Sequence, residues 1–395
     1  MEWKQEIKKQ DGSIEIPKRW LHIHYYEALN ILFRFENSLR VFVYIILKNE
    51  YKNEWMNCQF DLYGSSKTIK GISNQRISQA NNFGYLGFDV TSPLMHLTSG
   101  ELIELITSKA YWEVFKLYFR GNMSIIKNKL LEIGTVRNSL AHFRPIKQDD
   151  IELIKQNTNH TLMGVEECLE NVFSQSYRVP TNTDEDWYKE ICSLGNELIN
   201  IFLFYSQDEN WVKCELEFSV QILNRTDYGN NIYGFSVTNL NTPNVLNQYK
   251  ELSSFVTYIN ESTTFPTLDS DFNMVIKKKI NLVFRKDVLI DNIVVITSEV
   301  KNLLIKILEE TDLLKGDNLA RGKIVEPINT SSYWEDGIEG KSGKWEHNYS
   351  NFINTYESNH PNEYWGQMRY SNDIIAGSQI YPWMPANVSE YEISW

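Results

Sequence analysis

The chain of 395 residues has few cysteines, no long apolar run and no excess of positive charge. Its four cysteines show no Cys-x2-Cys spacing, which argues against a zinc site and a disulfide framework. They are Cys58, Cys168, Cys192 and Cys214. The longest apolar candidate, VFVYIILKNEY, is interrupted by Lys48, well short of the ~20 residues that cross a bilayer. We therefore expect no membrane segment. Because MEWKQEIKKQDGS lacks the apolar core of a signal peptide, we expect a cytoplasmic protein.

The net charge of −12 argues against a protein that coats nucleic acid, since phosphate binding draws on clustered Lys and Arg. One window differs: residues 120–150 hold six basic and three acidic residues, a net charge of +3. The basic residues are Arg120, Lys127, Lys129, Arg137, Arg144 and Lys147. The sequence has no Walker loop and no Gly-x-Gly-x-x-Gly stretch, and we expect no cofactor.

The first half of the sequence has the periodicity of helices. Apolar residues recur at helical spacing from Arg19 to about Tyr51. Within this helix Glu36 and Arg40 stand four residues apart, the spacing of an ion pair. Residues 53–93 are poorer in pattern and contain several glycines, which predicts loops and short elements.

Further helices are expected from residue 98 onward. Thr98 or Ser99 suits the N-cap of the first, and MSIIKNKLLEIGTVRNSLAHF predicts a second that Pro145 ends. Helical pattern continues to about Phe173, and residues 187–205, WYKEICSLGNELINIFLFY, predict one more helix.

After residue 208 the pattern becomes that of strands. Apolar and polar residues alternate in WVKCELEFSVQIL, residues 211–223. We expect residues 232–240 to form its return strand and residues 272–284 a further strand, whose three consecutive lysines indicate a solvated edge. A helix capped by Ser298 follows. The predicted fold class is α+β: an N-terminal tail over 1–18, an all-α bundle over 19–207 and a strand-rich domain over 208–395.

The stretch VRNSLAHFRP, residues 136–145, gathers polar side chains at the end of an apolar helix. Asn138 and His142 are four residues apart and share a face, and Arg144 follows them. Arg137 lies about 140° around an ideal helix from His142, and its long side chain can curl towards the histidine near the helix end. The Arg-x4-His spacing alone is weak evidence, because residues 19–24, RWLHIH, have it too.

These residue types suit cleavage of RNA without a metal ion. RNA supplies its own nucleophile, the 2′-hydroxyl, so the protein needs only a proton carrier and a cation at the phosphate. His142 provides general acid/base chemistry near neutral pH. Arg137 can bind the phosphate in bidentate fashion as charge builds there, and Asn138 can orient the imidazole or the phosphate. Because one histidine is too few for separate acid and base roles, we expect two copies to meet across a two-fold axis.

The residues RNSLAH resemble the motif of the HEPN domains: an arginine, four to six residues and a histidine, commonly with Asn, Asp or His after the arginine. Arg137, Asn138 and His142 fit its shortest form, in a wording common among abortive-infection-type members. The approach HLTSGELIELITSKAYWEVFKLYF is similar, as is FENSLRVFVYIIL, in which Glu36 and Arg40 match a polar pair of related domains. The resemblance covers about residues 19–180.

The resemblance implies a small helical bundle, usually dimeric with the motifs facing one another. It implies an endoribonuclease of antiphage defence or toxin activity that leaves 2′,3′-cyclic phosphate and 5′-hydroxyl ends and uses no metal. Arg137, Asn138 and His142 would be catalytic, with Glu36 and Arg40 in support. Arg144, Lys147 and Arg120 are our candidates for RNA binding.

Two other functions stay open. Some HEPN domains are inactive scaffolds, so the bundle can be a dimerisation module whose C-terminal domain binds a protein or phage component. Alternatively, the C-terminal aromatics can stack a base or line a ligand pocket, although such residues more often pack in a core. The C-terminal region, which we expect to be irregular, holds five tryptophans: Trp334, Trp345, Trp365, Trp383 and Trp395.

Overall fold

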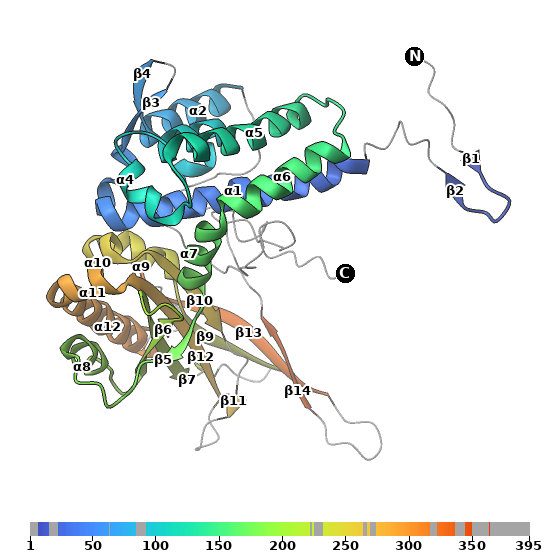
Figure 1. Ribbon diagram of the computed structural model, residues 1–395. Helices are drawn as coiled ribbons and strands as arrows, with labels where there is room; N and C mark the ends of the chain where they lie inside the picture. The colour runs from blue at the N-terminus through green and yellow to red at the C-terminus, as the bar shows by residue number, and fades with distance from the viewer. Residues whose placement is uncertain are drawn as a thin grey trace.

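The computed structural model has a helical N-terminal part and a C-terminal part built around a β-sheet, which confirms the α+β class (Figure 1). The structure describes residues 7–15, 23–62, 64–83, 92–221, 223–224, 232–263, 267–268, 274–316, 322–335, 344–349 and 363.

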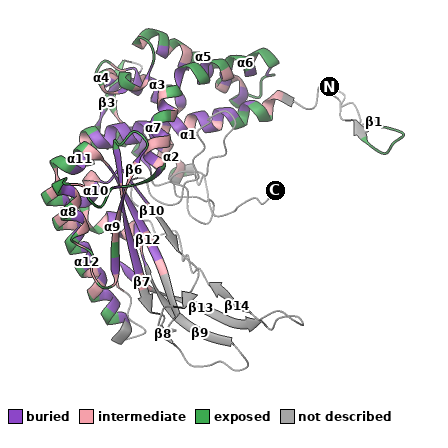
Figure 2. Ribbon diagram, turned by 60° about the horizontal axis from the view of Figure 1, so that its bottom comes forward, coloured by how far each residue is buried: buried purple, intermediate pink, exposed green. Residues whose placement is uncertain are grey.

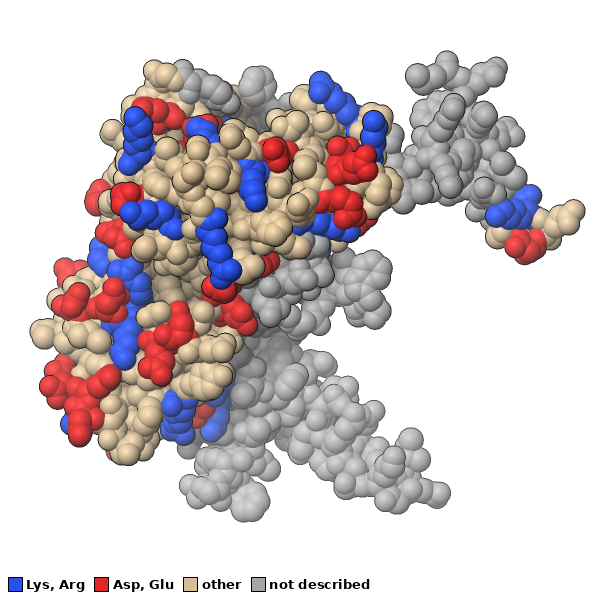
Figure 3. Space-filling model, viewed as in Figure 1, with Lys and Arg blue, Asp and Glu red and all other residues tan. Residues whose placement is uncertain are grey.

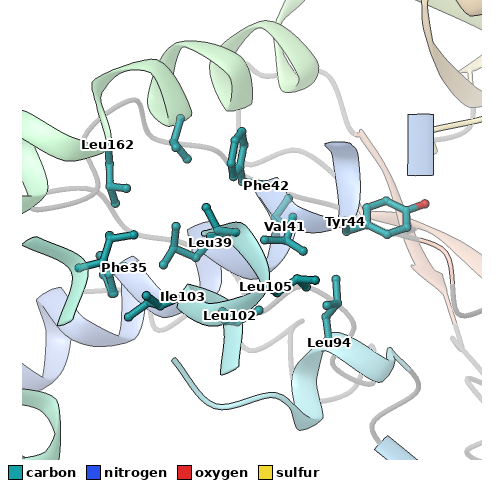
Figure 4. Close-up of a cluster of buried hydrophobic side chains, with 14 of the residues drawn as sticks. Phe35, Leu39, Val41, Phe42, Tyr44, Leu94, Leu102, Ile103, Leu105 and Leu162 are labelled. Atoms are coloured by element: carbon teal, nitrogen blue, oxygen red, sulfur yellow. The ribbon is translucent and has the colours of Figure 1, made fainter. Parts of the chain in front are cut away.

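A 29-residue helix, α1 (Ile23–Tyr51), is the axis of the helical part. Four helices pack on it: α3 (Ser99–Ile106), α5 (Met123–Ala141), α6 (Gln148–Thr161) and α7 (Met163–Phe173). Figure 4 shows Phe35 and Leu39 of α1 among buried side chains of α3. Burying each such side chain contributes about 1.5–3 kcal/mol, so this core fixes α1 as the support of the bundle.

The start of α3 agrees with the predicted cap. The Thr98 hydroxyl accepts a hydrogen bond from the Glu101 N–H at 3.3 Å, and the Glu101 carboxylate accepts one from the Thr98 N–H at 2.7 Å. This reciprocal pair satisfies two backbone donors that the first turn would otherwise leave without partners. The helix stops at Ile106 and is followed by α4 (Trp112–Phe115) and the 3-10 helix η3 (Lys116–Tyr118).

The segment between α1 and α3 contains more regular structure than the sequence predicts. It comprises η1 (Lys52–Asn57), the hairpin of β3 (Gln59–Leu62) and β4 (Ser65–Thr68), the 15-residue helix α2 (Ile69–Phe83) and η2 (Pro93–His96). Helix α2 buries few apolar side chains, chiefly Ile69 and Ile72, so its sequence carries little periodicity.

The C-terminal part is organised by a six-stranded antiparallel sheet with the order β10-β12-β7-β6-β5 and a short β11 on β12. The strands are β5 (Gln175–Arg178), β6 (Ile199–Ser206), β7 (Trp211–Gln221), β10 (Tyr258–Thr263), β11 (Thr267–Leu268) and β12 (Met274–Arg285). The alternation in residues 211–223 thus predicts β7 correctly, and it is a central strand.

Helices cover one face of this sheet. They are α8 (Asp186–Cys192), α9 (Thr242–Gln248), α10 (Lys250–Phe255), α11 (Lys286–Asp291) and α12 (Ile293–Gly316). Figure 2 shows α8 and α12 along the sheet. Leu216 and Phe218 of β7 share a buried core with Leu303 and Ile307 of α12. The helix predicted after residue 298 is therefore present, but it begins earlier, so Ser298 lies inside it and is not its cap.

Charged side chains pair across β7 and β12. Lys279 lies 2.7 Å from Glu215 and 3.4 Å from Glu217, and Lys277 lies 3.2 Å from Glu217. Lys278 is instead buried and donates to the Leu240 carbonyl. The expectation that these lysines mark a solvated edge is wrong, because β12 pairs with β7 on one side and β10 on the other.

A second antiparallel sheet has the order β14-β13-β9-β8. Its strands are β8 (Leu223–Asn224), β9 (Ile232–Leu240), β13 (Val325–Glu335) and β14 (Lys344–Tyr349). The strand expected over 232–240 is thus present but pairs with β8 and β13. Residues 334 and 345 are opposite each other in the β13–β14 pair, so part of the region expected to be irregular is a hairpin. Trp365, Trp383 and Trp395 lie outside the described residues.

The two parts are joined through contacts between α1 and the sheet. Trp211 and Tyr258 belong to the same core cluster as the helical bundle. The Thr257 hydroxyl donates to Asn49 of α1 at 3.1 Å, and Arg285 pairs with Glu50 at 2.9 Å. The helical part therefore packs directly on the sheet.

The division between helices and sheet lies earlier than residue 208. The single helix expected over 187–205 is wrong: α8 ends at Cys192, residues 193–198 form a turn and a short connection, and β6 begins at Ile199. Strands β5 and β6 both belong to the six-stranded sheet, so the sheet begins at Gln175, inside the range assigned to the helical domain. The expected N-terminal tail contains a small hairpin of β1 (Ile7–Lys8) and β2 (Ile14–Glu15).

Across the described ranges, no helix is both long enough and apolar enough to span a bilayer.

Candidate active site

Helix α5 carries the predicted catalytic residues at its C-terminal end. Its N-cap is Asn122, whose side chain accepts from the Ile125 N–H at 3.0 Å. One stripe of the helix is buried: Ile126, Leu130, Ile133, Val136 and Leu140. Two further apolar residues of the helix, Ile125 and Leu131, are exposed. This buried stripe fixes the rotation of α5 and leaves Asn138 and His142 exposed to solvent.

The end of α5 is a Schellman motif. His142 is the C-cap, the Arg144 N–H donates to the Ser139 carbonyl at 2.9 Å, and the Phe143 N–H donates to the Leu140 carbonyl at 3.0 Å. Phe143 has a φ of 55°, the left-handed conformation that glycine normally supplies at this position. A side chain there costs roughly 1–2 kcal/mol. The helix thus ends before Pro145, with a strained residue directly after the candidate histidine.

Arg137 forms an ion pair with Glu36 of α1. Its Nε lies 3.7 Å from the Glu36 carboxylate, and the same carboxylate pairs with Arg40 one turn further along α1. Glu36 is 14% exposed and Arg40 11%, whereas the Arg137 side chain is 35% exposed. One nearly buried carboxylate therefore orients an arginine whose outer part faces solvent.

Arg40 fixes this carboxylate in place. Its Nε and Nη2 donate to the carbonyls of Leu94 and Leu97 at 3.2 and 3.1 Å, and Nη1 donates to Asn37 at 3.1 Å. Burial lowers the pKa of Arg40, and Arg137 nearby adds to the lowering, while Glu36 opposes it. The predicted ion pair of Glu36 and Arg40 therefore exists, and Arg137 joins it to form a cluster of two cations around one anion.

Arg144 and Lys147, the predicted RNA-binding residues nearest the motif, lie in the turn between α5 and α6 and are exposed. The Lys147 N–H donates to Asp150 at 2.8 Å, which caps α6. Figure 3 shows Lys and Arg side chains at this end of the bundle with acidic side chains beside them. The surface is therefore mixed in charge, although the sequence window is net positive.

The structure does not bring Arg120 to this end. Arg120 precedes α5 and faces Glu167 of α7 at 3.9 Å, with 72% of its side chain exposed. The length of α5 separates it from His142 by about 30 Å, at 1.5 Å per residue. The prediction grouped Arg120 with Arg144 and Lys147 because they are close in sequence. The long helix α5 places them far apart in space.

Aromatic side chains that the sequence pattern does not predict lie beside His142. Tyr25 of α1 stacks on Phe143 with ring centroids 6.4 Å apart and an interplanar angle of 6°. Its hydroxyl donates to the Leu140 carbonyl at 3.3 Å, and its ring meets the exposed Tyr26 edge-on. Phe143 itself is 78% exposed. The sequence signal was an aromatic residue directly after the motif histidine, but its exposure depends on the turn.

No group of three or more His, Cys, Asp or Glu side chains placed to hold a metal ion occurs within the described part of the chain. The arrangement at the end of α5 offers instead an anchored guanidinium, an exposed imidazole and an exposed amide. These groups can bind an anion and transfer a proton beside it. Comparison of the chain with protein-family models, curated proteins and solved structures finds no match.

Proposed function

We propose that the chain is a metal-independent endoribonuclease of the HEPN type, cleaving RNA to 2′,3′-cyclic phosphate and 5′-hydroxyl ends. The observation that supports this best is the anchoring of Arg137. Glu36, nearly buried on α1, is the shared partner of Arg40 and of the partly exposed Arg137. Such an anchor serves a site that must present a guanidinium to a phosphate in one fixed orientation.

In the proposed reaction the 2′-oxygen attacks the adjacent phosphorus, and the bond from phosphorus to the 5′-oxygen breaks. The 2′-hydroxyl proton passes to a histidine acting as base, and the leaving 5′-oxygen takes a proton from an acid. Arg137 would neutralise the charge that builds on the phosphate oxygens, and Asn138 would orient the imidazole or a phosphate oxygen. No water and no metal ion enters the bond-making step.

The proposed reaction needs an acid and a base, and each copy of the motif carries one histidine. His142 is exposed on the outer end of the bundle, where a second copy can approach it. We therefore propose a homodimer in which His142 of one protomer and His142 of its partner share the two proton transfers across a two-fold axis. A role in antiphage defence or as a toxin, with the sheet part sensing a trigger or recruiting substrate, completes the proposal.

Incubation of the purified chain with total RNA in EDTA tests this function. The wild type should cleave, and Arg137→Ala should not. If neither protein cleaves RNA under any cellular trigger, the nuclease assignment fails. If EDTA abolishes cleavage by the wild type, the mechanism is wrong even though a nuclease is present.

The alternative is a non-catalytic interaction module. One observation favours it: among the described residues, no hydrogen bond joins Arg137 to His142, and the ion-pair partner of Arg137 is Glu36. In that case the cluster would serve to fix α5 on α1. His142→Ala separates the two functions, because a scaffold would keep its effect in cells when the imidazole is removed, whereas a nuclease would lose it.

A further inference from the structure

Phe143 combines three properties that its role in the fold does not explain. It lies directly between His142 and Arg144, the residue is 78% exposed, and its backbone is left-handed at a φ of 55°. Glycine adopts this conformation without strain and is the usual residue at this position of a Schellman motif. A phenylalanine here bears a backbone cost, and its exposed ring gains little from burial to offset it.

The ring of Phe143 packs on one side against Tyr25. Tyr25 lies parallel to it, and the Tyr25 hydroxyl donates to the Leu140 carbonyl, which also accepts from the Phe143 N–H. Tyr25 thus contacts both the ring and the turn that presents it. Tyr26, also exposed, meets the edge of Tyr25 with centroids 6.0 Å apart. The result is an aromatic surface beside the candidate histidine, held by α1.

We propose that Phe143 is a stacking platform for the base next to the cleaved phosphate, and that the substrate is therefore RNA that is unpaired at the cleavage site. This rests on the proposed ribonuclease function. A base offers its π-face to an aromatic ring only when it is not stacked and paired within a duplex. With the phosphate on Arg137 and His142, the neighbouring nucleoside would lie against the next residue of the chain. Because every base has a π-face, the platform tolerates different sequences.

A base fits this surface better than a second protein does. The aromatic surface consists of Phe143, Tyr25 and Tyr26, and three side chains supply less area than the ~800 Å² that each partner contributes to a stable interface. The exposed, charged Arg144 follows Phe143 in the chain, as suits a ligand with a phosphate beside an aromatic base. The homodimer must therefore draw on surface beyond these three side chains.

Phe143→Gly tests the platform, because it removes the ring while giving the turn its preferred residue. In a His142→Ala background, affinity for a short unstructured RNA is measured by fluorescence anisotropy, with and without Phe143→Gly. We expect the thermal midpoint to stay equal or rise, and the dissociation constant to increase about 10-fold, the usual effect of losing one base–aromatic stack. Phe143→Trp should keep the affinity. Leu117→Ala removes an exposed apolar side chain of η3, which precedes the N-terminal end of α5 and lies far from the motif, and should change nothing.

The same RNA annealed into a duplex should bind equally to both proteins, with or without Phe143. Unchanged affinity of Phe143→Gly for the single strand would overturn the proposal, as would equal loss of affinity for duplex and single strand. A Phe143→Gly protein that dissociates from dimer to monomer would also overturn it, because the ring would then serve a protein interface.

The outcomes for the platform and for the nuclease can be told apart. If the wild type cleaves RNA and Phe143→Gly leaves KM unchanged, the platform is wrong and the nuclease stands. If the wild type cleaves no RNA but single-strand affinity still depends on Phe143, the platform stands as a binding site and the nuclease is wrong.

Discussion

The two ends of α5 carry similar basic side chains in different surroundings. At the N-terminal end, Arg120 is largely exposed and faces an exposed carboxylate of Glu167. At the C-terminal end, Arg137 rests on the nearly buried Glu36, which Arg40 holds in turn. An exposed pair contributes little and moves freely, whereas a buried carboxylate fixes the direction of its partner. Positive charge on one helix thus becomes a candidate site only where a buried partner orients it.

The largest expected difference between the two ends is in catalysis. Arg137→Ala should lower kcat/KM for RNA cleavage by about 100- to 1,000-fold, the usual effect of removing a group that stabilises developing charge. Arg120→Ala removes the same charge at the other end of the helix and should change kcat/KM by less than about 2-fold. Cleavage of a labelled RNA measures both, and equal losses would show that only overall charge matters.

The second largest effect is expected when Glu36, the ion-pair partner of Arg137, is changed. Glu36→Gln keeps the shape of the side chain but leaves Arg40 and Arg137 close together without their shared anion. We expect the free energy of unfolding to fall by about 2–3 kcal/mol and kcat to fall about 10-fold or more with little change in KM, because Arg137 loses its orientation. Denaturant unfolding and steady-state cleavage measure these.

Glu104→Gln is the matched control for the anchor. Glu104 of α3 pairs with Lys127 of α5 at 2.7 Å, and both side chains are about one-third exposed. This change should cost less than about 1 kcal/mol and leave kcat unaltered. A kcat for Glu36→Gln that matches the control would mean that Glu36 does not act through Arg137.

Lys48 of α1 extends the comparison to a cation whose side chain is fully buried. Lys48 is 1% exposed, with Glu363 at 3.7 Å, and burial lowers its pKa to about 8. The unfolded chain keeps this lysine protonated to about pH 10.5, so between about pH 8 and 10.5 the unfolded state binds more protons. The contribution of Lys48 to stability therefore rises with pH across this window.

Comparison with Lys48→Met isolates this effect. Between about pH 8 and 9.5, the wild type should gain roughly 1–2 kcal/mol of unfolding free energy relative to Lys48→Met. Denaturant unfolding at the two pH values measures the difference. Parallel pH dependence of the two proteins would contradict the lowered pKa of Lys48.

The smallest effect is expected at the exposed pair. Glu167→Gln removes the partner of Arg120 and should change the free energy of unfolding by less than about 0.5 kcal/mol. A larger loss of unfolding free energy would mean that the ion pair at this end of α5 also stabilises the fold, and the contrast between the two ends would disappear.

Local features of the fold could be predicted from sequence where a residue and its near neighbours decide the structure. The Thr98 cap, the helix that leads to His142 and the alternation of β7 are of this kind. The misread segments lack such a pattern. Within residues 187–205, strand β6 carries apolar residues on both faces and so mimics a buried helix, and α2 buries too few apolar residues to show a period.

Only part of the candidate site could be predicted from sequence, for a related reason. Arg137 and Asn138 lie in α5 and His142 caps its end, so all three could be named from one continuous stretch of sequence. The contact of Arg137 with Glu36 joins residues 101 positions apart in the sequence, and it depends on how α1 packs against α5. The left-handed turn at Phe143 was hidden because a phenylalanine gives no signal for it. Pro145 suggested a different end to the helix.

The central claim is that the RNA supplies the nucleophile, and a single 2′-deoxy substitution tests it most directly. An oligonucleotide that the wild type cleaves in EDTA is compared with one carrying 2′-deoxyribose on the 5′ side of the cleaved phosphate. We predict that this one change abolishes cleavage at that position, and that the unmodified RNA yields 2′,3′-cyclic phosphate and 5′-hydroxyl ends. Continued cleavage at the deoxy position, or products with 3′-hydroxyl and 5′-phosphate ends, would contradict the account.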